Sequence, residues 1–294
     1  MAQRVPTSAQ ALRALLEKPG LVLMPCCYDA LSARLIESSG FELTFMSGFG
    51  VSAARIGASD TGLISYGEMV DQGRDICAAV RIPVIGDGDT GYGNAVNVKR
   101  TVRGYAQVGF AGVMIEDQVA PKRCGHTRGK QVVSRAEAVA RLSAAVDARE
   151  EGSDVVIVAR TDARATHGLD EALERARAFA DLGADVVFVE ALESTEELAA
   201  VGRALSKPLL ANMLEGGKTP ILAPPELEAL GYKLAAYPVT LLNAAIVAMR
   251  SALDKLRRGE RPEGLLDFGE LQRAVGFDAY DREAARYAAP PASD

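Results

Sequence analysis

One run of the 294-residue chain, from Lys122 to His126, brings a thiol, an imidazole and two cations together. Positively charged neighbours lower the pKa of a thiol and make it a usable acid, base or nucleophile near neutral pH. Cys26 and Cys77 stand in apolar surroundings instead, which is typical of small core residues. The sequence therefore predicts reactive chemistry at Cys124, with Lys122 and His126 beside it.

Three carboxylates follow apolar runs upstream of this thiol: Asp87 and Asp89, two residues apart, and Glu116 at the end of the next run. Crowded carboxylates raise each other's pKa unless a cation holds them, and Mg²⁺ accepts oxygen ligands while it keeps several waters. The chain has only two histidines, so a zinc site built from histidine is not expected. The pattern predicts a site for Mg²⁺, with Mn²⁺ as an alternative. The competing interpretation is a glycine-rich turn.

Arg160 and Asn212 also stand at the ends of apolar runs. The planar guanidinium of arginine matches the shape of a carboxylate, so both residues are candidates for binding a substrate carboxylate or a developing oxyanion. The alternative for each is a structural role, such as a pair between Arg160 and Asp162.

Eight short apolar runs, rich in Val, Ile, Leu and Phe, alternate along the chain with segments of helical periodicity. Such continuous apolar runs are typical of parallel strands that are buried on both faces. Eight units of this kind favour a (β/α)8 barrel of the TIM type over an open Rossmann-like sheet. We expect strands at 21–25, 41–46, 82–86, 111–115, 154–159, 185–190, 208–211 and 232–236, and helices at 7–17, 30–38, 65–79, 94–108, 134–150, 170–182, 195–205, 225–230, 241–258 and 278–287. We treat residues 1–294 as one barrel domain with 241–294 as a C-terminal helical extension.

In such a barrel every strand delivers its carboxyl end to the same face, where active sites are built. Polar or ionisable side chains follow all eight predicted strands, among them Ser47, Asp162, Glu190, Glu215 and Thr240. A single polar residue at a strand end is usually a turn former. Convergence at all eight ends predicts an active site at this face.

The composition excludes several other classes of function. The 39 acidic residues outnumber the 33 basic ones, and no basic stripe is present, so a nucleic-acid partner is not expected. No apolar run approaches the roughly 18 residues that cross a bilayer, and the N-terminus is not signal-like, so we expect neither a membrane partner nor export. The four cysteines have no C-x-x-C spacing, which indicates reduced thiols and a cytoplasmic protein.

Several motifs stand at or after the ends of the predicted strands: Ser47-Gly48, Asp87-Gly88-Asp89-Thr90-Gly91, Ile115-Glu116-Asp117-Gln118, Lys122-Arg123-Cys124-Gly125-His126, Ala159-Arg160-Thr161-Asp162-Ala163 and Asn212-Met213-Leu214-Glu215-Gly216-Gly217-Lys218-Thr219-Pro220. Together they resemble the isocitrate lyase and phosphoenolpyruvate mutase superfamily over about residues 20 to 255. Within it the chain is most similar to the 2-alkylmalate lyases of the 2,3-dimethylmalate lyase and petal death protein group.

The resemblance implies a Mg²⁺-dependent carbon–carbon lyase that cleaves a 2-hydroxy dicarboxylate to a 2-keto acid, such as pyruvate, and a carboxylate. It implies that Asp87 ligates the metal directly and that Asp60, Asp89 and Glu116 act through bound waters. Cys124 would then donate the proton that completes the cleavage, with His126 and Lys122 beside it.

The resemblance also implies a set of residues that bind the substrate. Ser47 and Gly48 would hold the carboxylate of the part that leaves as the 2-keto acid, and Arg160 would neutralise charge on the substrate. The rest of the expected substrate-binding set is Gly125, Glu190, Asn212 and Thr240.

Differences between this sequence and the motifs of related enzymes reduce the number of candidate reactions and substrates. Phosphoenolpyruvate mutases carry a different loop in place of Cys-Gly-His, so no mutase activity is expected here. The 2-methylisocitrate lyases have a tyrosine two positions before the Ser-Gly pair, where this chain has Phe45, which weakens that substrate and leaves the base for the 2-hydroxyl unassigned. In oxaloacetate hydrolases a serine near the eighth strand matters, and the nearest polar residue here is Thr240, so we favour the lyase.

Two further expectations remain open at this point. A non-catalytic barrel that binds a keto acid is the alternative from another class, although a pure binder has no use for a thiol among cations. The resemblance also implies that the C-terminal helices are exchanged between subunits in a homotetramer, a dimer of dimers.

Overall fold

A computed structural model describes residues 6–127 and 129–288 of the chain. The chain divides into two compact units at residue 242, and each is described here by itself: a barrel unit up to Leu242, and a C-terminal unit that starts at Asn243. The prediction that residues 1–294 form a single domain stays a prediction.

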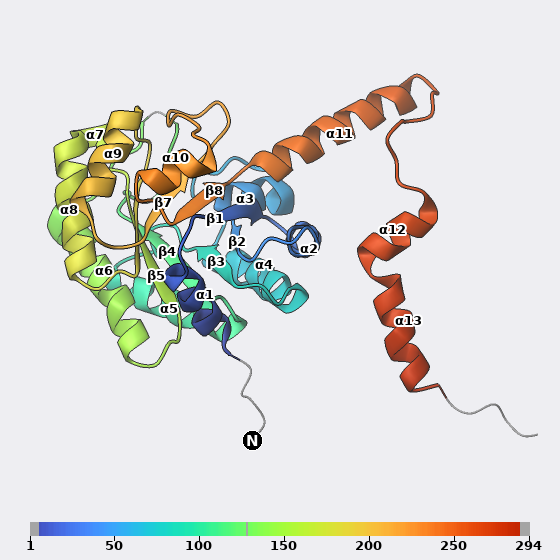
Figure 1. Ribbon diagram of the computed structural model, residues 1–294, viewed down its shortest axis with the longest axis horizontal. Helices are drawn as coiled ribbons and strands as arrows, with labels where there is room; N and C mark the ends of the chain where they lie inside the picture. The colour runs from blue at the N-terminus through green and yellow to red at the C-terminus, as the bar shows by residue number, and fades with distance from the viewer. Residues whose placement is uncertain (1–5, 128, 289–294) are drawn as a thin grey trace, which may run out of the picture. The chain divides into compact units, whose positions relative to one another are not determined.

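The barrel unit is a closed barrel of eight parallel strands in sequence order (Figure 1). The first and last strands close it, with Val22 opposite Leu234 and Met24 opposite Ala236. This architecture confirms the predicted (β/α)8 fold. The strands are β1 (Val22–Cys27), β2 (Thr44–Met46), β3 (Val84–Asp87), β4 (Gly112–Glu116), β5 (Val156–Thr161), β6 (Val186–Val189), β7 (Leu209–Asn212) and β8 (Leu234–Tyr237).

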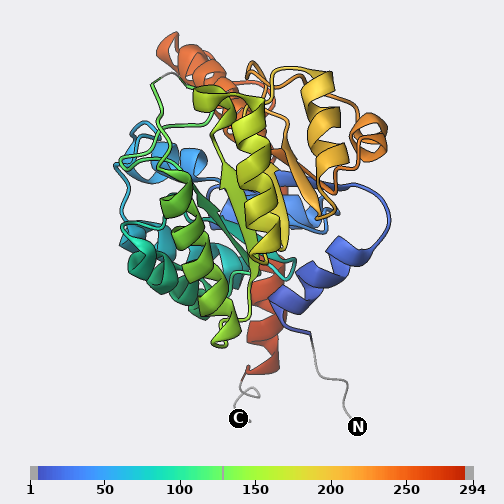
Figure 2. The same cartoon turned by 90° about the vertical axis from the view of Figure 1, so that its left-hand side faces the viewer.

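Helices alternate with these strands and surround the barrel, as two perpendicular views show (Figures 1 and 2). Most begin at a side-chain cap: Ser65, for example, accepts from the backbone N–H of Glu68 and so satisfies one free N–H of the first turn. The helices of this unit are α1 (Ser8–Glu17), α2 (Ala30–Ser38), α3 (Gly48–Ile56), α4 (Tyr66–Ala79), α5 (Ala95–Val108), α6 (Arg135–Glu150), α7 (Arg164–His167), α8 (Leu169–Asp181), α9 (Thr195–Ala204) and α10 (Pro224–Ala229); α11 (Thr240–Arg257) begins in it.

Side chains alternate along each strand, which produces two separate apolar clusters. Met24 and Cys26 belong to the smaller cluster, inside the barrel, and Cys27 belongs to the larger one between the strands and the helices. Leu12 of α1 joins the interior cluster, and it lies near Gly112, the first residue of β4. Helix α1 therefore closes the end of the barrel where the strands begin, and the opposite end stays available for a site.

The sequence does not predict α3, because glycine is a poor helix former and α3 begins Gly48-Phe49-Gly50. Tertiary packing explains these glycines. A Cβ atom on Gly48 would stand 2.6 Å from Oδ2 of Asp87, and one on Gly50 would stand 2.8 Å from Cβ of Tyr28. Gly48 thus lets the first turn of α3 approach the end of β3, and Gly50 lets it approach the residue after β1.

The C-terminal unit contains most of α11, followed by α12 (Phe268–Val275) and α13 (Phe277–Arg286). The sequence predicts the first and the last of these helices and misses α12. Neither α12 nor α13 has a buried residue in this structure. Among the described residues, no helix is both long and apolar enough to cross a membrane.

Candidate active site

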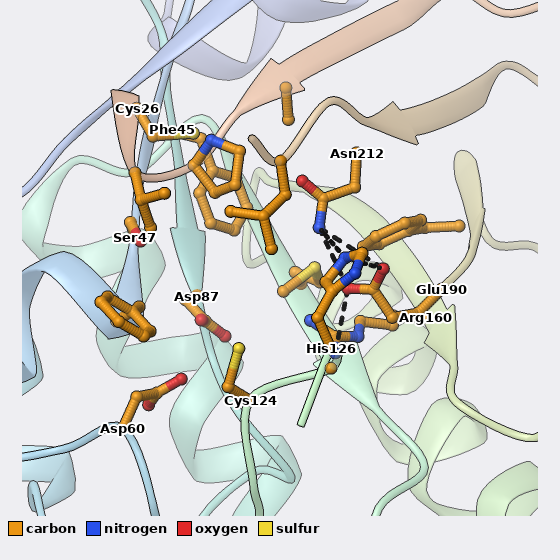
Figure 3. A pocket seen from close by; sticks show the side chains of 18 of the residues that line it. Cys26, Phe45, Ser47, Asp60, Asp87, Cys124, His126, Arg160, Glu190 and Asn212 are labelled. Carbon is orange, nitrogen blue, oxygen red and sulfur yellow. Dashed lines mark hydrogen bonds and ion pairs between the residues drawn. The ribbon is translucent and has the colours of Figure 1, made fainter. Parts of the chain in front are cut away.

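A cavity of about 340 Å³ opens at the carboxyl ends of the barrel strands (Figure 3). Most of the site residues predicted from the sequence line it: Ser47, Asp60, Asp87, Lys122, Cys124, Gly125, His126, Arg160, Glu190 and Asn212. Four predicted residues are not part of this lining, namely Gly48, Asp89, Glu116 and Thr240. In Figure 3, Asp60 and Asp87 lie on one side, and the cluster of His126, Arg160, Glu190 and Asn212 lies on the other.

Asp87 is fixed by two backbone N–H groups. The backbone N–H of Gly48 donates to its Oδ2 at 3.2 Å, and that of Asp89 donates to its Oδ1 at 3.0 Å. Asp89 and Glu116 are buried nearby. Burial raises the pKa of Asp89 to about 7 against the opposing charge of Lys122, and Asp87 and Asp60 add to the rise. Burial likewise raises the pKa of Glu116 well above its ordinary range, although Arg160 opposes the shift.

Lys122 provides a positive charge inside this acidic cluster. Its Nζ lies 2.5 Å from Oδ1 of Asp60 and 2.9 Å from Oδ1 of Asp89, and the side chain is buried. Burial alone would lower the pKa of Lys122, but Asp89, Asp87, Asp60 and Glu116 together raise it well above its ordinary range. Lys122 is therefore a stable ammonium that joins the Cys124 loop to the carboxylates.

The carboxylate cluster has the chemistry of a Mg²⁺ site. Oε1 of Glu116 is buried without a hydrogen-bond partner, and Oδ1 of Asp60 and of Asp89 meet the Lys122 ammonium without hydrogen-bond geometry. No three carboxylate, imidazole or thiol groups of the described residues converge closely enough to hold an ion on their own. Mg²⁺ takes one or two carboxylates directly and keeps several waters, so it does not require three converging side chains.

Cys124 lies on the loop between β4 and α6, at the edge of the cavity. An antiparallel bridge between Gln118 and Val132 pins the two ends of this loop. The C=O of Cys124 accepts from the hydroxyl of Thr127 at 2.8 Å and from its backbone N–H at 3.0 Å. A half-buried thiol thus sits in a defined turn, beside the cavity.

The expectation that basic neighbours lower the pKa of Cys124 is wrong. Burial has the largest effect and raises this pKa, while a hydrogen bond with the His126 backbone opposes the rise. Asp60 and Glu190 add to the rise, and Arg160 has a smaller lowering effect. Two basic neighbours in the sequence are engaged elsewhere: Lys122 is paired with two aspartates, and the exposed guanidinium of Arg123 lies beside Gly129. A third, Arg128, lies outside the described residues. Cys124 is therefore a protonated thiol near neutral pH, which suits a proton donor better than a nucleophile.

Arg160, on β5, organises the other side of the cavity. It donates to Asp162 from Nε at 2.8 Å and from Nη2 at 3.1 Å, and it lies 3.3 Å from Glu116 and 3.2 Å from Glu190. Burial alone would raise the pKa of Glu190, but Arg160 and His126 outweigh it and hold that pKa below its usual range. Arg160 is paired with Asp162 and also lines the cavity. The pair therefore orients Arg160 and does not remove it from the site.

His126 links two loops above the cavity. Its Nε2 lies 3.0 Å from Oε1 of Glu190, and its Nδ1 accepts from the backbone N–H of Lys218 at 3.0 Å. A ring nitrogen that accepts from an N–H carries no proton, so the remaining ring proton sits on Nε2 and is donated to Glu190. The amide of Asn212 also donates to Glu190, at 3.1 Å. His126 is thus engaged with Glu190 and with the loop after β7.

Most of the rest of the lining is apolar, and of these apolar residues the sequence analysis connected only Phe45 with the substrate. They are Cys26, Phe45, Phe49, Met114, Phe188, Leu210, Leu214, Ala236, Pro238 and Val239, and the polar residues Arg123, Thr127 and Glu215 complete the lining. Near the end of β8 the cavity meets Pro238 and Val239, whereas the hydroxyl of Thr240 donates to Glu215 at 2.6 Å. The period of two along β2, β4, β6 and β7 was the signal that could have found Phe45, Met114, Phe188 and Leu210.

Comparisons with known proteins match the chain over most of its length. A family model described as phosphoenolpyruvate phosphomutase matches residues 12–257. The chain is 42% identical over 285 residues to 2,3-dimethylmalate lyase of Eubacterium barkeri, which covers 96% of this chain and 98% of that protein. It is 40% identical over 278 residues to 2-methylisocitrate lyase of Aeropyrum pernix, with 93% of this chain and 89% of that protein covered.

Solved structures give the same result. A crystal structure of 2,3-dimethylmalate lyase, described as a PEP mutase/isocitrate lyase superfamily member, superposes with a TM-score of 0.92 at 39% identity and covers 97% of each chain. Oxaloacetate acetylhydrolase with the inhibitor 3,3-difluorooxalacetate gives 0.91 at 38% identity, over 96% of this chain and 98% of that one. Phosphonopyruvate hydrolase complexed with oxalate and Mg²⁺ gives 0.85 at 29%, over 96% and 99%.

Proposed function

The chain belongs to the phosphoenolpyruvate mutase and isocitrate lyase superfamily, and on that premise we propose that it is a Mg²⁺-dependent lyase for 2-alkylmalates. It would cleave the C2–C3 bond of a 2-hydroxy dicarboxylate to give a 2-keto acid, such as pyruvate, and a carboxylate. The observation that carries the proposal is the protonated Cys124 thiol at a cavity with carboxylates on one side and Arg160 on the other.

The metal is proposed to be Mg²⁺, with Mn²⁺ as an alternative, held by Asp87 directly and by Asp60, Asp89 and Glu116 through waters. When bound, it would supply a positive charge that holds the C1 carboxylate and lowers the pKa of the substrate's 2-hydroxyl. Support comes from the oxygen-only donor set and from the buried, unpaired Oε1 of Glu116. The Mg²⁺ of the related phosphonopyruvate hydrolase complex points the same way.

The side chains divide the remaining work. Ser47, at the N-terminus of α3, binds the carboxylate of the departing 2-keto acid, since a helix N-terminus favours anions. The N–H of Gly48 beside it is donated to Asp87. Arg160, with Glu190 and Asn212 behind it, faces the other carboxylate. The 2-hydroxyl gives up its proton to water, and C2 becomes the carbonyl carbon of the 2-keto acid as the C2–C3 bond breaks. The electron pair of that bond passes to C3, and the thiol of Cys124 gives its proton to that carbon. His126 and Lys122 hold the loop that carries Cys124.

The lining favours an alkyl substituent over a third carboxylate. Of the basic side chains that line the cavity among the described residues, Lys122 and Arg160 are paired with protein carboxylates and Arg123 is exposed to solvent. His126 lies 3.0 Å from Glu190. A 2-methylisocitrate molecule would bring a further negative charge, whereas the apolar side chains around Leu210 and Pro238 suit a methyl or larger alkyl group. Pro238 and Val239 at the end of β8 also support the lyase over an oxaloacetate hydrolase, which relies on a hydroxyl there.

We also propose that the protein is a cytoplasmic homotetramer, a dimer of dimers with exchanged C-terminal helices. Within the barrel unit, a groove between β1, α2 and β8 is lined by Leu23, Leu35, Phe41 and Leu241. Within the C-terminal unit, large apolar side chains are exposed: Val247, Leu253, Leu256, Phe268, Leu271, Phe277 and Tyr280. Both surfaces need a covering partner. The four free cysteines support a reducing compartment.

A substrate panel tests the function. The protein with Mg²⁺ is incubated with several 2-alkylmalates, 2-methylisocitrate or oxaloacetate, and 2-keto acid and oxalate are measured, with EDTA as the control. We expect pyruvate from at least one alkylmalate, and none with EDTA. Consumption of oxaloacetate to oxalate alone would identify a hydrolase, and binding of keto acids without any turnover would identify a non-catalytic barrel.

A further inference from the structure

The residue before Cys124 is held by a buried side chain that the proposed mechanism does not use. Gln118 is fully buried, and its amide pairs with the backbone of Arg123 on both sides: Nε2 donates to the C=O at 2.8 Å, and Oε1 accepts from the N–H at 3.0 Å. Both hydrogen-bonding groups of the residue that precedes the thiol are therefore fixed by one side chain.

The residue after Cys124 is held in the same way by Lys130. Its buried ammonium donates to the C=O of Gly125 and, at 2.6 Å, to Oδ1 of Asp162. Asp162 is fully buried and also accepts both hydrogen bonds from Arg160. Lys130 thus ties the thiol's loop to the carboxylate that orients Arg160.

Both holding side chains are anchored to the barrel unit's rigid elements. The C=O of Gln118 accepts from the buried Arg141 of α6 at 2.7 Å, and Gln118 pairs with Val132 across the base of the loop. Asp162 follows β5 directly, and its backbone N–H donates to Asp117 at 2.9 Å. Cys124 is therefore positioned from the strand ends, although it lies several residues away from them in the sequence.

We propose that Gln118 and Lys130 are positioning residues that hold the Cys124 thiol at a fixed place beside the cavity. The inference rests on the proposed function, in which Cys124 protonates a carbon. Proton transfer needs the donor within hydrogen-bond reach of the acceptor, and small misplacements of a reacting group are costly. Two hydrogen bonds before the thiol and one after it limit its movement in both directions along the loop.

The variants Gln118→Leu and Lys130→Met test the proposal, because each removes the hydrogen bonds and keeps most of the side-chain volume. Gln131→Leu is the matched control for the first, since Gln131 is exposed on the same loop. Lys207→Met, in the turn before β7, is the control for the second. Arg123 is exposed and Asp162 keeps Arg160, so these groups retain water or a partner. The buried C=O of Gly125 loses its donor in Lys130→Met, so the stability of this variant is measured as well.

The first readout is the rate at which iodoacetamide alkylates Cys124 in the metal-free protein, followed by mass spectrometry across a pH series. Burial raises the pKa of this thiol, so we expect slow alkylation in the wild type until the pH passes the ordinary thiol value of about 8.5. In both test variants the profile should shift to lower pH and the rate at pH 7.5 should rise at least about threefold. Cys26, buried in the barrel, serves as the internal reference.

Profiles of Gln118→Leu and Lys130→Met that both match the wild type would overturn the proposal. Gln118→Glu adds a graded case, because it keeps an acceptor for the Arg123 N–H and loses the donor to its C=O. It should fall between wild type and Gln118→Leu, and it keeps the test usable if the leucine variant does not fold.

The second readout is turnover of the alkylmalate with Mg²⁺. We expect kcat of Gln118→Leu to fall roughly tenfold with little change in KM, because the thiol acts in the transition state and not in binding. An unchanged kcat in a variant with altered alkylation would show that the position of the thiol does not limit the reaction. The alkylation profile needs no activity, so it still tests the positioning role if the substrate panel gives no turnover.

Discussion

The two ends of the barrel differ in the kind of side chain that they bury. At the end where strands begin, Leu12 of α1 is fully buried against Gly112, and the contacts are apolar. At the end where strands finish, Asp89, Glu116, Lys122, Arg160, Asp162 and Glu190 are all buried ionisable residues. Burying charge is costly unless each group is paired, so this second end gives up stability to place ionisable groups at the cavity. Changes at the first end should affect folding, and changes at the second should affect chemistry.

Among the changes that distinguish the two ends of the barrel, Asp87→Ala should have the largest effect on activity. This change removes the proposed direct metal ligand, so activity with Mg²⁺ should fall roughly a thousandfold, the equivalent of several kcal/mol of transition-state stabilisation. The melting temperature should stay the same or rise, because a buried negative charge is lost. Asp75→Ala, at an exposed position of α4, is the control. An unchanged response of activity to Mg²⁺ would remove Asp87 from the metal site.

Leu12→Ala tests the other end of the barrel. The cavity left behind should lower the free energy of unfolding by about 2 to 5 kcal/mol, measured by urea denaturation. The turnover of the molecules that remain folded should match the wild type, because α1 does not contribute to the cavity lining. A large loss of kcat at unchanged stability would contradict the claim that this end of the barrel affects folding and the other end affects chemistry.

Gly48→Ala should have a smaller effect that is confined to the metal. The added Cβ would meet Oδ2 of Asp87 at 2.6 Å, so the carboxylate must move. Mg²⁺ affinity measured by calorimetry should weaken roughly tenfold, as for other changes that reorient a ligand. Gly67→Ala, on α4 with open space around it, should leave the affinity as it is. Equal affinities for the two variants would show that the position of Asp87 does not depend on the first turn of α3.

The pattern of strands and strand ends predicted most of the site, because a parallel barrel brings all its carboxyl ends to one face. Five residues that line the cavity stand at the end of a strand or directly after one: Ser47, Asp87, Arg160, Glu190 and Asn212. Asp60 came only from the family resemblance, since it belongs to the segment between α3 and α4, where periodicity carries no information.

What the sequence could not show is where neighbouring side chains point. Lys122 and Arg123 adjoin Cys124 in the chain, yet one pairs with Asp60 and the other lies beside Gly129. The pKa of the thiol is therefore raised by burial instead of lowered. Gln118 and Lys130 escaped prediction for a related reason, because their partners are backbone groups of a folded loop.

Cys124→Ser tests the central claim most directly. Serine keeps the size and the hydrogen-bonding pattern but is a far weaker acid, so kcat for the alkylmalate should fall roughly a hundredfold or more. Mg²⁺ and keto-acid binding, measured by calorimetry on the same preparation, should stay within about twofold of the wild type, because the thiol enters only at the proton-transfer step. Turnover equal to that of the wild type would contradict the assignment of Cys124 as the proton donor.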